Sequence, residues 1–492
     1  MPNEGSFDRT ITRRTALKAA AATGLALTTQ GLLELLALPT HRLAEAAPET
    51  LPDIQFDIRA FVPPAQTVDG VIVRFGPVFT HFVTLALRRR PSLADQKLLA
   101  AALGTIESRY PFSPAGVFVF VGYGVPYFNR LPGGLRGTLV RGYIPRLRSS
   151  RNRLALEEAV PGPTDLAPSN PAISKATYNV PLVIEANDLL LTLRSDVLGK
   201  TGDVLDWLLR GSDQLNGQPV PSPHFNGLFS ITSNRVMFQQ MGLPRRVADE
   251  QGLAFAARVN VRSPMWMGFA DQQASGSGPP EITTFQGNRS AVLTTCGPRS
   301  YMRNGAIQHL SHVILDLEQF YAGSDEPFTE RVQYMFRSNP IPALGNPDQF
   351  ADGGGPAFLE NVFQGSFDAR ANAAAIKTFQ GEHRMGHLAA LQRSSRAADG
   401  TPIHIRMDGP GYDQLDVPDG SAQPKLQFTA FVPTADFFAR MRRNQASLDL
   451  VRKYSVADEN NGLERFITAT RRQNFLVPPR RHRAFPLLEL AD

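Results

Sequence analysis

Apolar residues along the chain follow the two spacings that distinguish strands from helices. The stretch DIQFDIRAFV, residues 53–62, alternates polar and apolar positions and predicts a half-buried strand. Further strand-like runs cover residues 116–131, 178–196, 228–242 and 425–433, and residues 71–87 predict a strand or a strand–helix segment. Residues 308–321 begin as a strand and lead into a helix.

Helical spacing appears between these runs. Residues 92–110 have it, with Ser92 as the expected N-cap, and residues 204–215 form a second such stretch. Residues 434–454 predict an amphipathic helix whose apolar side carries Phe437, Phe438, Met441 and Leu448.

Strands interspersed with helices, in two parts of similar size, predict an α+β protein of two sheet-and-helix domains. We expect an N-terminal domain at 47–240 and a C-terminal domain at 241–492. The length of 492 residues is sufficient for two substantial cores.

Residues 1–46 are expected to be an export signal. TRRTALK, residues 12–18, places paired arginines ahead of the small-residue apolar stretch AAAATGLALTT, which is the pattern of a twin-arginine signal. Ala44 and Ala46 offer a cleavage site, and the apolar stretch is too short for a stable membrane anchor. The predicted location is periplasmic or extracellular, with the twin-arginine export machinery as a partner. The alternative is an ordinary amphipathic N-terminal helix.

Charge and cysteine content exclude several classes of function. The net charge is only +6, and the densest basic clusters, residues 88–90 and 480–483, are interpreted as solvated surface rather than a nucleic-acid site. The single cysteine, Cys296, excludes internal disulfides, cysteine zinc clusters and iron–sulfur ligation. The chain lacks the nucleophile elbow, the phosphate-binding loop and the H-E-x-x-H motif.

Nine histidines leave few combinations for a metal site. His309 and His312 lie in one predicted strand, where alternation sends them to opposite faces. His383 and His387 are four residues apart and would share one face of a helix.

One aspartate ends an unusually apolar stretch. In MWMGFADQQ, residues 265–273, Asp271 follows Trp266 and Phe269 and precedes a Gly/Ser/Pro run. It is either the cap of the next turn or the acid–base group of a pocket.

Taken in order, several segments resemble those of dye-decolorising peroxidases. The segments are GVFVFVGYGVPYFNRL, NDLLLTLRSD, MGFADQQ, MGHLAAL, IHIRMDGPGYD, KLQFTAFVPTADFFARM and GLERFITATRRQNFLVPP. MGFADQQ is similar to the family's G-F-x-D-G signature, MGHLAAL to its haem-ligand segment and IHIRMDGPGYD to its arginine segment. The resemblance covers roughly residues 53–480.

This resemblance implies two ferredoxin-like domains of the dimeric α+β barrel superfamily, with one haem b per chain in the C-terminal domain. His387 would be the iron ligand, with His383 and His404 as alternatives. Asp271 would be the acid–base group and Arg406 the arginine beside the peroxide. Trp266, Gly268 and Phe269 would line the cofactor site.

The implied function is an exported haem peroxidase that oxidises an unidentified organic donor with hydrogen peroxide. The same resemblance leaves two alternatives, a secreted haem- or ligand-binding protein and a family relic without turnover. Gln272 stands where the family signature has glycine, so the backbone turn that presents Asp271 is expected to differ from the family's. This difference concerns whether the protein has peroxidase turnover. Proteins of this fold often associate, so a homo-oligomer is expected.

Overall fold

The structure is a computed structural model of the chain. It describes residues 29–39, 50–267, 280–322, 404–446, 455 and 463–491, with gaps at 63–65, 69–70, 74–75, 149, 151–152, 157–176, 179, 287–293 and 298. The twin-arginine motif and the expected cleavage site, Ala44 and Ala46, lie outside the described residues.

The first half of the sheet has ferredoxin-like strand order. Its four antiparallel strands are β3 (Phe79–Leu87), β4 (Phe118–Tyr123), β6 (Leu189–Ser195) and β9 (Phe229–Phe238). They lie side by side in the order β4-β6-β3-β9. Helix α3 (Leu93–Arg109) connects β3 to β4, and α6 (Leu198–Leu205), extended by a π-helical turn at Asp206–Arg210, lies between β6 and β9.

The second half repeats this arrangement. Its strands are β10 (Ala306–Leu315), β11 (Ile405–Arg406), β12 (Gly409–Asp413), β13 (Gln423–Val432) and β14 (Ile467–Val477). Their order is β11-β13-β10-β14, with β12 also paired to β13, and α13 (Ala435–Ala446) connects β13 to β14. The predicted α+β class with two ferredoxin-like units is confirmed.

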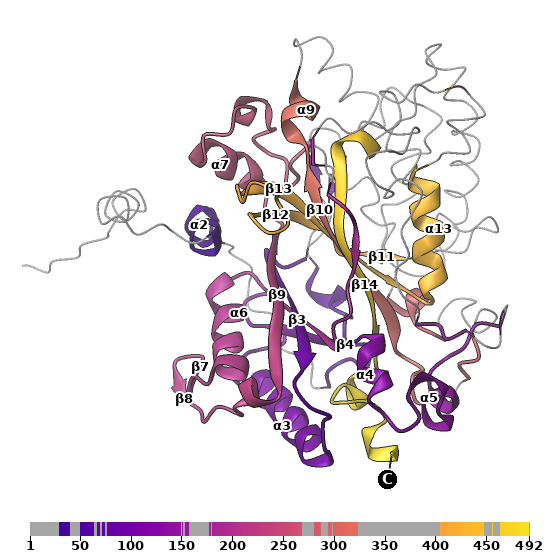
Figure 1. Cartoon of the computed structure of the whole chain (residues 1–492). Coiled ribbons are helices and arrows are strands. Elements are labelled where there is room, and N and C mark those ends of the chain that lie inside the picture. The colour runs from indigo at the N-terminus through magenta and orange to yellow at the C-terminus, as the bar shows by residue number, and fades with distance from the viewer. Residues whose placement is uncertain are drawn as a thin grey trace, which may run out of the picture.

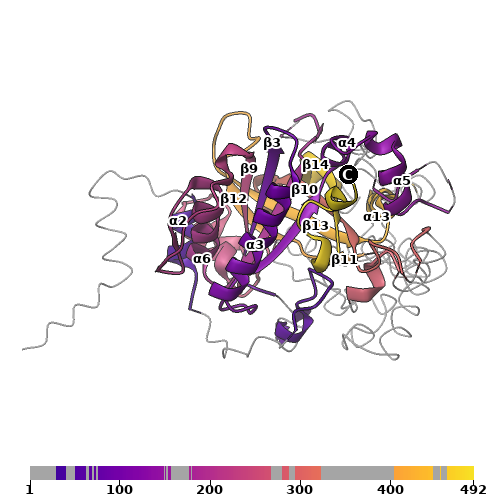
Figure 2. The ribbon, with the colours of Figure 1, turned by 90° about the horizontal axis from the view of Figure 1, so that it is seen from below.

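Both halves belong to one curved sheet. On one side β14 pairs with β4 at Leu476 and Tyr123. On the other side β12 contacts β9, where Gln239 Nε2 donates to the carbonyl of Asp408 at 2.5 Å. The strands therefore surround a shared interior, while α3 and α6 lie outside the first half and α13 outside the second (Figures 1 and 2).

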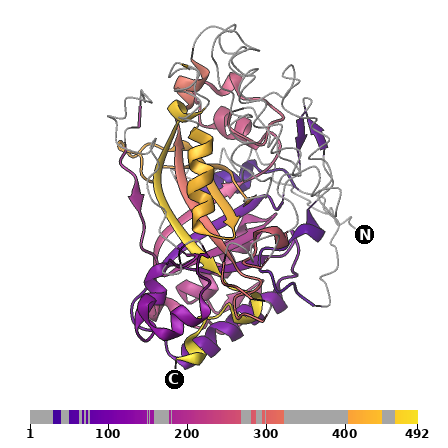
Figure 3. The same cartoon turned by 90° about the vertical axis from the view of Figure 1, so that its right-hand side faces the viewer.

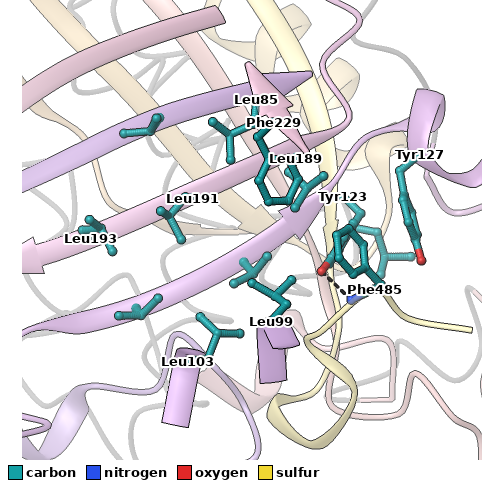
Figure 4. Packing of buried hydrophobic residues seen from close by; sticks show 14 of the residues in the cluster. Leu85, Leu99, Leu103, Tyr123, Tyr127, Leu189, Leu191, Leu193, Phe229 and Phe485 are labelled. Carbon is teal, nitrogen blue, oxygen red and sulfur yellow. Dashed lines mark hydrogen bonds between the residues drawn. The ribbon is translucent and has the colours of Figure 1, made fainter. Parts of the chain in front are cut away.

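The hydrophobic core is not divided at residue 240. Aromatic and aliphatic side chains from both halves fill the interior, among them Phe82, Phe118, Phe120, Phe431 and Phe475. A second cluster lies under α3 and reaches the C-terminal tail, where Phe485 packs beside Tyr123 and Tyr127 (Figure 4). The tail of the second half thus completes the core of the first.

Residues 53–62 are not a strand, contrary to the alternation in their sequence. Ile54, Phe56 and Phe61 are buried in the shared interior, and a short 3-10 turn covers Arg59–Phe61. The side chain of Gln55 accepts from the amide of Val121 at 2.9 Å and donates to the carbonyl of Pro478 at 2.7 Å. Side-chain hydrogen bonds therefore replace a backbone ladder, and the segment fills one end of the interior.

The other elements are short. They are α2 (Thr29–Leu36), α4 (Val125–Asn129), α5 (Thr138–Tyr143), α7 (Leu243–Glu250), α9 (Leu317–Tyr321), β1 (Gln66–Val68), β2 (Val71–Val73), β5 (Val183–Ile184), β7 (Gln214–Leu215) and β8 (Gln218–Pro219). Among the residues that the structure describes, no helix has the length and apolar character needed to cross a membrane.

One local prediction from the sequence is confirmed and another is wrong. Ser92 caps α3 as expected, and with Asp95 it forms a capping box. The cluster at 480–483 is not simply solvated: Arg480 and Arg483 are largely buried and both pair with Glu107. Their carboxylate partner lies far away in the sequence, on α3, so the basic run alone gave no sign of it.

The hydrogen bonds between Tyr123 and the C-terminal tail lead to a prediction for one substitution. The hydroxyl of Tyr123 donates to the carbonyl of Arg483 and accepts from the amide of Phe485, both at 2.7 Å. Tyr123→Phe leaves both backbone groups buried without a partner, so we expect the free energy of unfolding to fall by about 1–3 kcal/mol. Urea unfolding would measure it, with the exposed Tyr143→Phe as the matched control. Equal stability of the two variants would contradict this role.

Candidate functional site

The segment that contains Arg406 forms the edge strand β11, and its successive side chains point alternately to the inner and outer faces of the sheet. Ile405 and Met407 pack into the shared interior. Because successive residues of an extended strand point to opposite faces, His404 and Arg406 lie on the outer face of the second half. The methionine next to Arg406 is thus on the other side of the sheet.

Arg406 belongs to a row of residues that runs across four strands. It pairs with Ala430 of β13, Ala430 pairs with His309 of β10, and His309 pairs with Asn474 of β14. In an antiparallel sheet, residues directly opposite each other share a face. Arg406, His309 and Asn474 therefore occupy the same outer face, which α13 partly covers (Figure 3).

His309 is held by hydrogen bonds and by stacking. Its Nδ1 donates to Asn474 Oδ1 at 2.7 Å, and its Nε2 accepts from the Ser311 hydroxyl at 2.6 Å. Its ring stacks on Phe438 of α13, with centroids 3.3 Å apart. The guanidinium of Arg472 donates to Ser311 Oγ at 3.1 Å and lies 5.3 Å from the same phenyl ring. These contacts hold an imidazole and a guanidinium on the outer face.

Arg406 carries a buried positive charge on this face. Its side chain is only 6% exposed, and its Nε lies 3.7 Å from Asp408 Oδ1. That separation permits an ion pair but is too long for a hydrogen bond. A buried guanidinium attracts anions strongly, because little water screens its charge. Asp408 offsets part of this charge.

Several predicted site residues lie outside the described part of the chain. They are Gly268, Phe269, Asp271, His383 and His387, and their roles stay predictions. In the parts of the chain that the structure describes, no three His, Cys, Asp or Glu side chains form a metal-binding group.

Trp266 is described, and it does not lie beside Arg406. Its Nε1 donates to the carbonyl of Gly411 at 2.9 Å, and its ring contacts Phe238 and Tyr412. Gly411 pairs with Lys425, which lies five positions along β13 from the partner of Arg406. At the rise of an extended strand, this is roughly 17 Å.

A largely buried ionic cluster, which no sequence motif indicated, lies at one end of the shared interior. Asp416, in the turn between β12 and β13, accepts from Arg235 Nη2 of β9 at 2.6 Å and from Arg471 Nε of β14 at 2.7 Å. Arg471 also pairs with Glu185 at 3.2 Å. Asp416 has a left-handed backbone, with φ of 61°, which non-glycine residues seldom adopt.

More ionisable side chains surround this cluster. Lys425 lies 3.8 Å from Asp413, and burial lowers the pKa of Lys425 to about 8. Burial also raises the pKa values of Asp413 and Glu185. His312 Nδ1 donates to Gln427 Oε1 at 2.5 Å, and burial holds the pKa of His312 well below its usual value.

The cluster joins elements that are remote in sequence. Arg235 belongs to the first half of the sheet, whereas Asp416 and Arg471 belong to the second, and the three meet where β9 approaches β12. No short motif connects these residues, so the sequence offered no signal for them. The cluster closes the sheet, and its carboxylates are occupied by ion pairs.

The model of a family of unknown function, DUF7405, matches residues 155–479, which is more than half of the chain. The chain belongs to this family. No curated protein matches the sequence of this DUF7405 protein.

Solved structures similar to this DUF7405 protein include DyP-type peroxidases. An encapsulated DyP-type peroxidase from Mycobacterium smegmatis has a TM-score of 0.45 at 13% identity, covering 83% of this chain and 95% of that one. A dye-decolorizing peroxidase from Bacteroides thetaiotaomicron has a TM-score of 0.45 at 14% identity, covering 88% and 99%. A variant of DypB from Rhodococcus jostii RHA1 in complex with haem has a TM-score of 0.44 at 12% identity, covering 83% and 95%. The fold class of the DUF7405 protein rests on its own strand order.

The ionic cluster of the DUF7405 protein predicts a pH-dependent stability. Arg235 and Arg471, acting against desolvation, hold the pKa of Asp416 at about 2, below its value of about 3.9 in an unfolded chain. This contribution is therefore fully present above about pH 4 and is lost as the pH falls towards 2. Asp416→Asn removes the charge with an amide that tolerates the same backbone conformation.

We expect Asp416→Asn to unfold at lower urea concentration than the parent protein at pH 7, and the difference to shrink between pH 4 and pH 2. The exposed Asp419→Asn, in the same turn region, is the matched control. A difference between parent and Asp416→Asn that does not change with pH would contradict the ion-pair explanation.

Proposed function

We propose that this DUF7405 protein is an exported, haem-dependent peroxidase of the dye-decolorising type. It would use hydrogen peroxide to oxidise an organic electron donor. The observation that carries the proposal is the buried guanidinium of Arg406 on the outer face of the second half of the sheet. The ordered series of sequence segments supports the same function, and Arg406 lies in the segment that resembles the family's arginine segment.

The outer face at β11 carries two side chains of the kinds that could contact haem b. A buried imidazole, His404, lies two residues from the buried guanidinium of Arg406, and both lie on the same side of the strand. Imidazole is a common axial ligand of haem iron, and guanidinium groups pair with anions such as carboxylates or peroxide.

The geometry of β11 discriminates between the candidate ligands. The histidine that would hold haem and the arginine that would act on peroxide have different roles and need separate positions around the group. His404 and Arg406 project side by side from the same side of one strand, so they would not fill these two roles together without rearrangement of β11. If Arg406 acts on peroxide, the ligand is His387 or His383. We propose His387.

When bound, haem supplies the redox centre at which the O–O bond of peroxide is broken. Asp271 takes a proton from one peroxide oxygen and gives it to the other, which leaves as water. The guanidinium of Arg406 stabilises the negative charge that develops as the bond breaks. Hydrogen peroxide is reduced to two water molecules, and the donor supplies two electrons and two protons overall.

A second function has its own supporting observation. Asp408 lies 3.7 Å from Arg406 and offsets the positive charge that would stabilise the breaking bond. Together with Gln272 in place of the signature glycine, this favours a haem- or ligand-binding protein without efficient turnover. The two functions share the site and differ in catalysis.

Export belongs to the proposal. The paired arginines Arg13 and Arg14 would direct the folded chain through the twin-arginine machinery to the periplasm or the cell exterior. Loading of haem before export is consistent with that route, which carries folded proteins.

The first test is an absorption spectrum. Protein produced with a supply of haem should show a Soret band, and His387→Ala should abolish it, because the iron would lose its axial ligand. His383→Ala, His404→Ala and the exposed His224→Asn should retain the band, with circular dichroism to confirm folding. Folded parent protein without a Soret band would reject both haem functions, and an unchanged His387→Ala spectrum would reject that ligand.

The second test separates catalysis from binding. Arg406→Leu and Asp271→Asn should each lower peroxidase kcat/KM by at least about 100-fold while the Soret band persists. The exposed Arg136→Leu is the matched control for the arginine substitution. A parent protein that binds haem but gives no turnover would instead support the binding function.

A further inference from the structure

The segment Thr29–Leu38 is built into the folded protein, although it lies within the predicted export signal. We call this segment the strap. Its helix, α2, places Leu32 and Leu33 in a buried cluster with Phe238, Leu243 and other side chains, and Leu33 is only 1% exposed. Figure 1 shows α2 beside α6 and α7, and contacts with both helices confirm this position.

Polar contacts fasten the end of the strap to the body. Gln240 accepts from the amide of Leu38 at 2.7 Å and donates to its carbonyl at 2.8 Å. Arg246 of α7 donates to the carbonyl of Leu36 at 2.9 Å and to Gln240 Oε1 at 2.7 Å. The last carbonyls of a helix have no partner within the helix, so Arg246 supplies one for α2.

The strap in turn completes another helix. The residue at the N-cap of α6 is Val197, whose side chain offers no hydrogen-bond acceptor. Glu34 of the strap accepts from the amide of Gly199, in the first turn of α6, at 3.2 Å. A carboxylate at a helix N-terminus satisfies an otherwise unpaired amide and interacts favourably with the helix dipole. The contact therefore replaces the cap that the local sequence lacks.

We propose that the strap remains part of the mature protein, seated on the surface formed by α6, α7 and the end of β9, so that the chain is not processed at Ala46. Removal of residues 1–46 would expose the apolar surface that Leu32 and Leu33 cover. It would also leave α6 without its cap and Gln240 and Arg246 without these partners. Any processing of the exported chain takes place before Thr29.

The strap forms only on a folded body. Its partners come from α6, the residue pair after β9 and α7, which are brought together by the tertiary structure. The twin-arginine motif lies shortly before the strap in the sequence. Docking of the strap thus requires a surface that exists only after the first half has folded.

The docking itself can be tested without export. A recognition sequence for a specific protease replaces residues 42–48 of the full chain, and the folded protein is then cut. We expect the N-terminal fragment to co-elute with the body in gel filtration. Leu32→Ala with Leu33→Ala should release it and lower the melting temperature by roughly 5 °C.

The matched control for this double variant is Leu38→Ala, whose side chain is 51% exposed and should leave both readouts unchanged. A fragment that separates from the unsubstituted body, with no change in melting temperature, would overturn the proposal.

The processing site needs a second measurement, which rests on the proposed export. The full chain is produced in a host with a twin-arginine pathway, and the mass of the exported protein is determined. An N-terminus at or before Thr29 supports the proposal, whereas an N-terminus at Ala47 overturns it. If no protein is exported, the export proposal fails, while the protease experiment still decides whether the strap is docked.

Discussion

Among the residues that the structure describes, the long helices α3, α6 and α13 lie on the outer faces of the two halves of the sheet, and the arrangement of the whole sheet depends on this (Figures 1 and 2). A sheet face that is not covered by helices must be buried against something else, because it carries a row of apolar side chains. Here the bare faces of the two halves face each other and enclose a single interior. Neither half has a complete core alone, since the tail after β14 packs against α3 and residues 53–62 fill the end of the interior.

A closed interior has to accommodate the polar residues that fall on the inward face. The aromatic side chains of the interior form one cluster. The charged side chains of Arg235, Lys425 and Asp416 lie instead near the junction of β9 with β12. Buried charges destabilise a protein unless they are paired. Here the pairs run from Arg235 through Asp416 and Arg471 to Glu185, and Lys425 pairs separately with Asp413. The ion pairs connect both halves of the sheet, so they also specify how its two edges come together.

Successive residues of a strand point to opposite faces of the sheet, so the candidate site residues lie on the outer face while their neighbours fill the interior. His312 and Met407 face inward, and His309 and Arg406 face outward. An anion or cofactor beside Arg406 would therefore lie outside the closed sheet, between its strands and the segments that cover them. The catalytic proposal depends on this outer face, and the retention of the strap depends on a different surface, formed by α6 and α7.

The capping of α3 by Ser92, the opposite faces of His309 and His312 and most of the strands and helices were predictable from the sequence, because these features depend on neighbours within a few residues. The resemblance of its ordered motifs also implied the two ferredoxin-like units and named Arg406 as a candidate site residue, whereas the burial of Arg406 is seen only in the structure. Other features depended on residues far apart in the chain. Only the tertiary structure showed that residues 53–62 are not a strand, that Arg480 and Arg483 are paired with Glu107 and that Asp416 joins Arg235 to Arg471. The strap shows this dependence most clearly, because in the sequence it lies within a predicted export signal. It is buried only because α6, β9 and α7 come together to form the surface on which it packs.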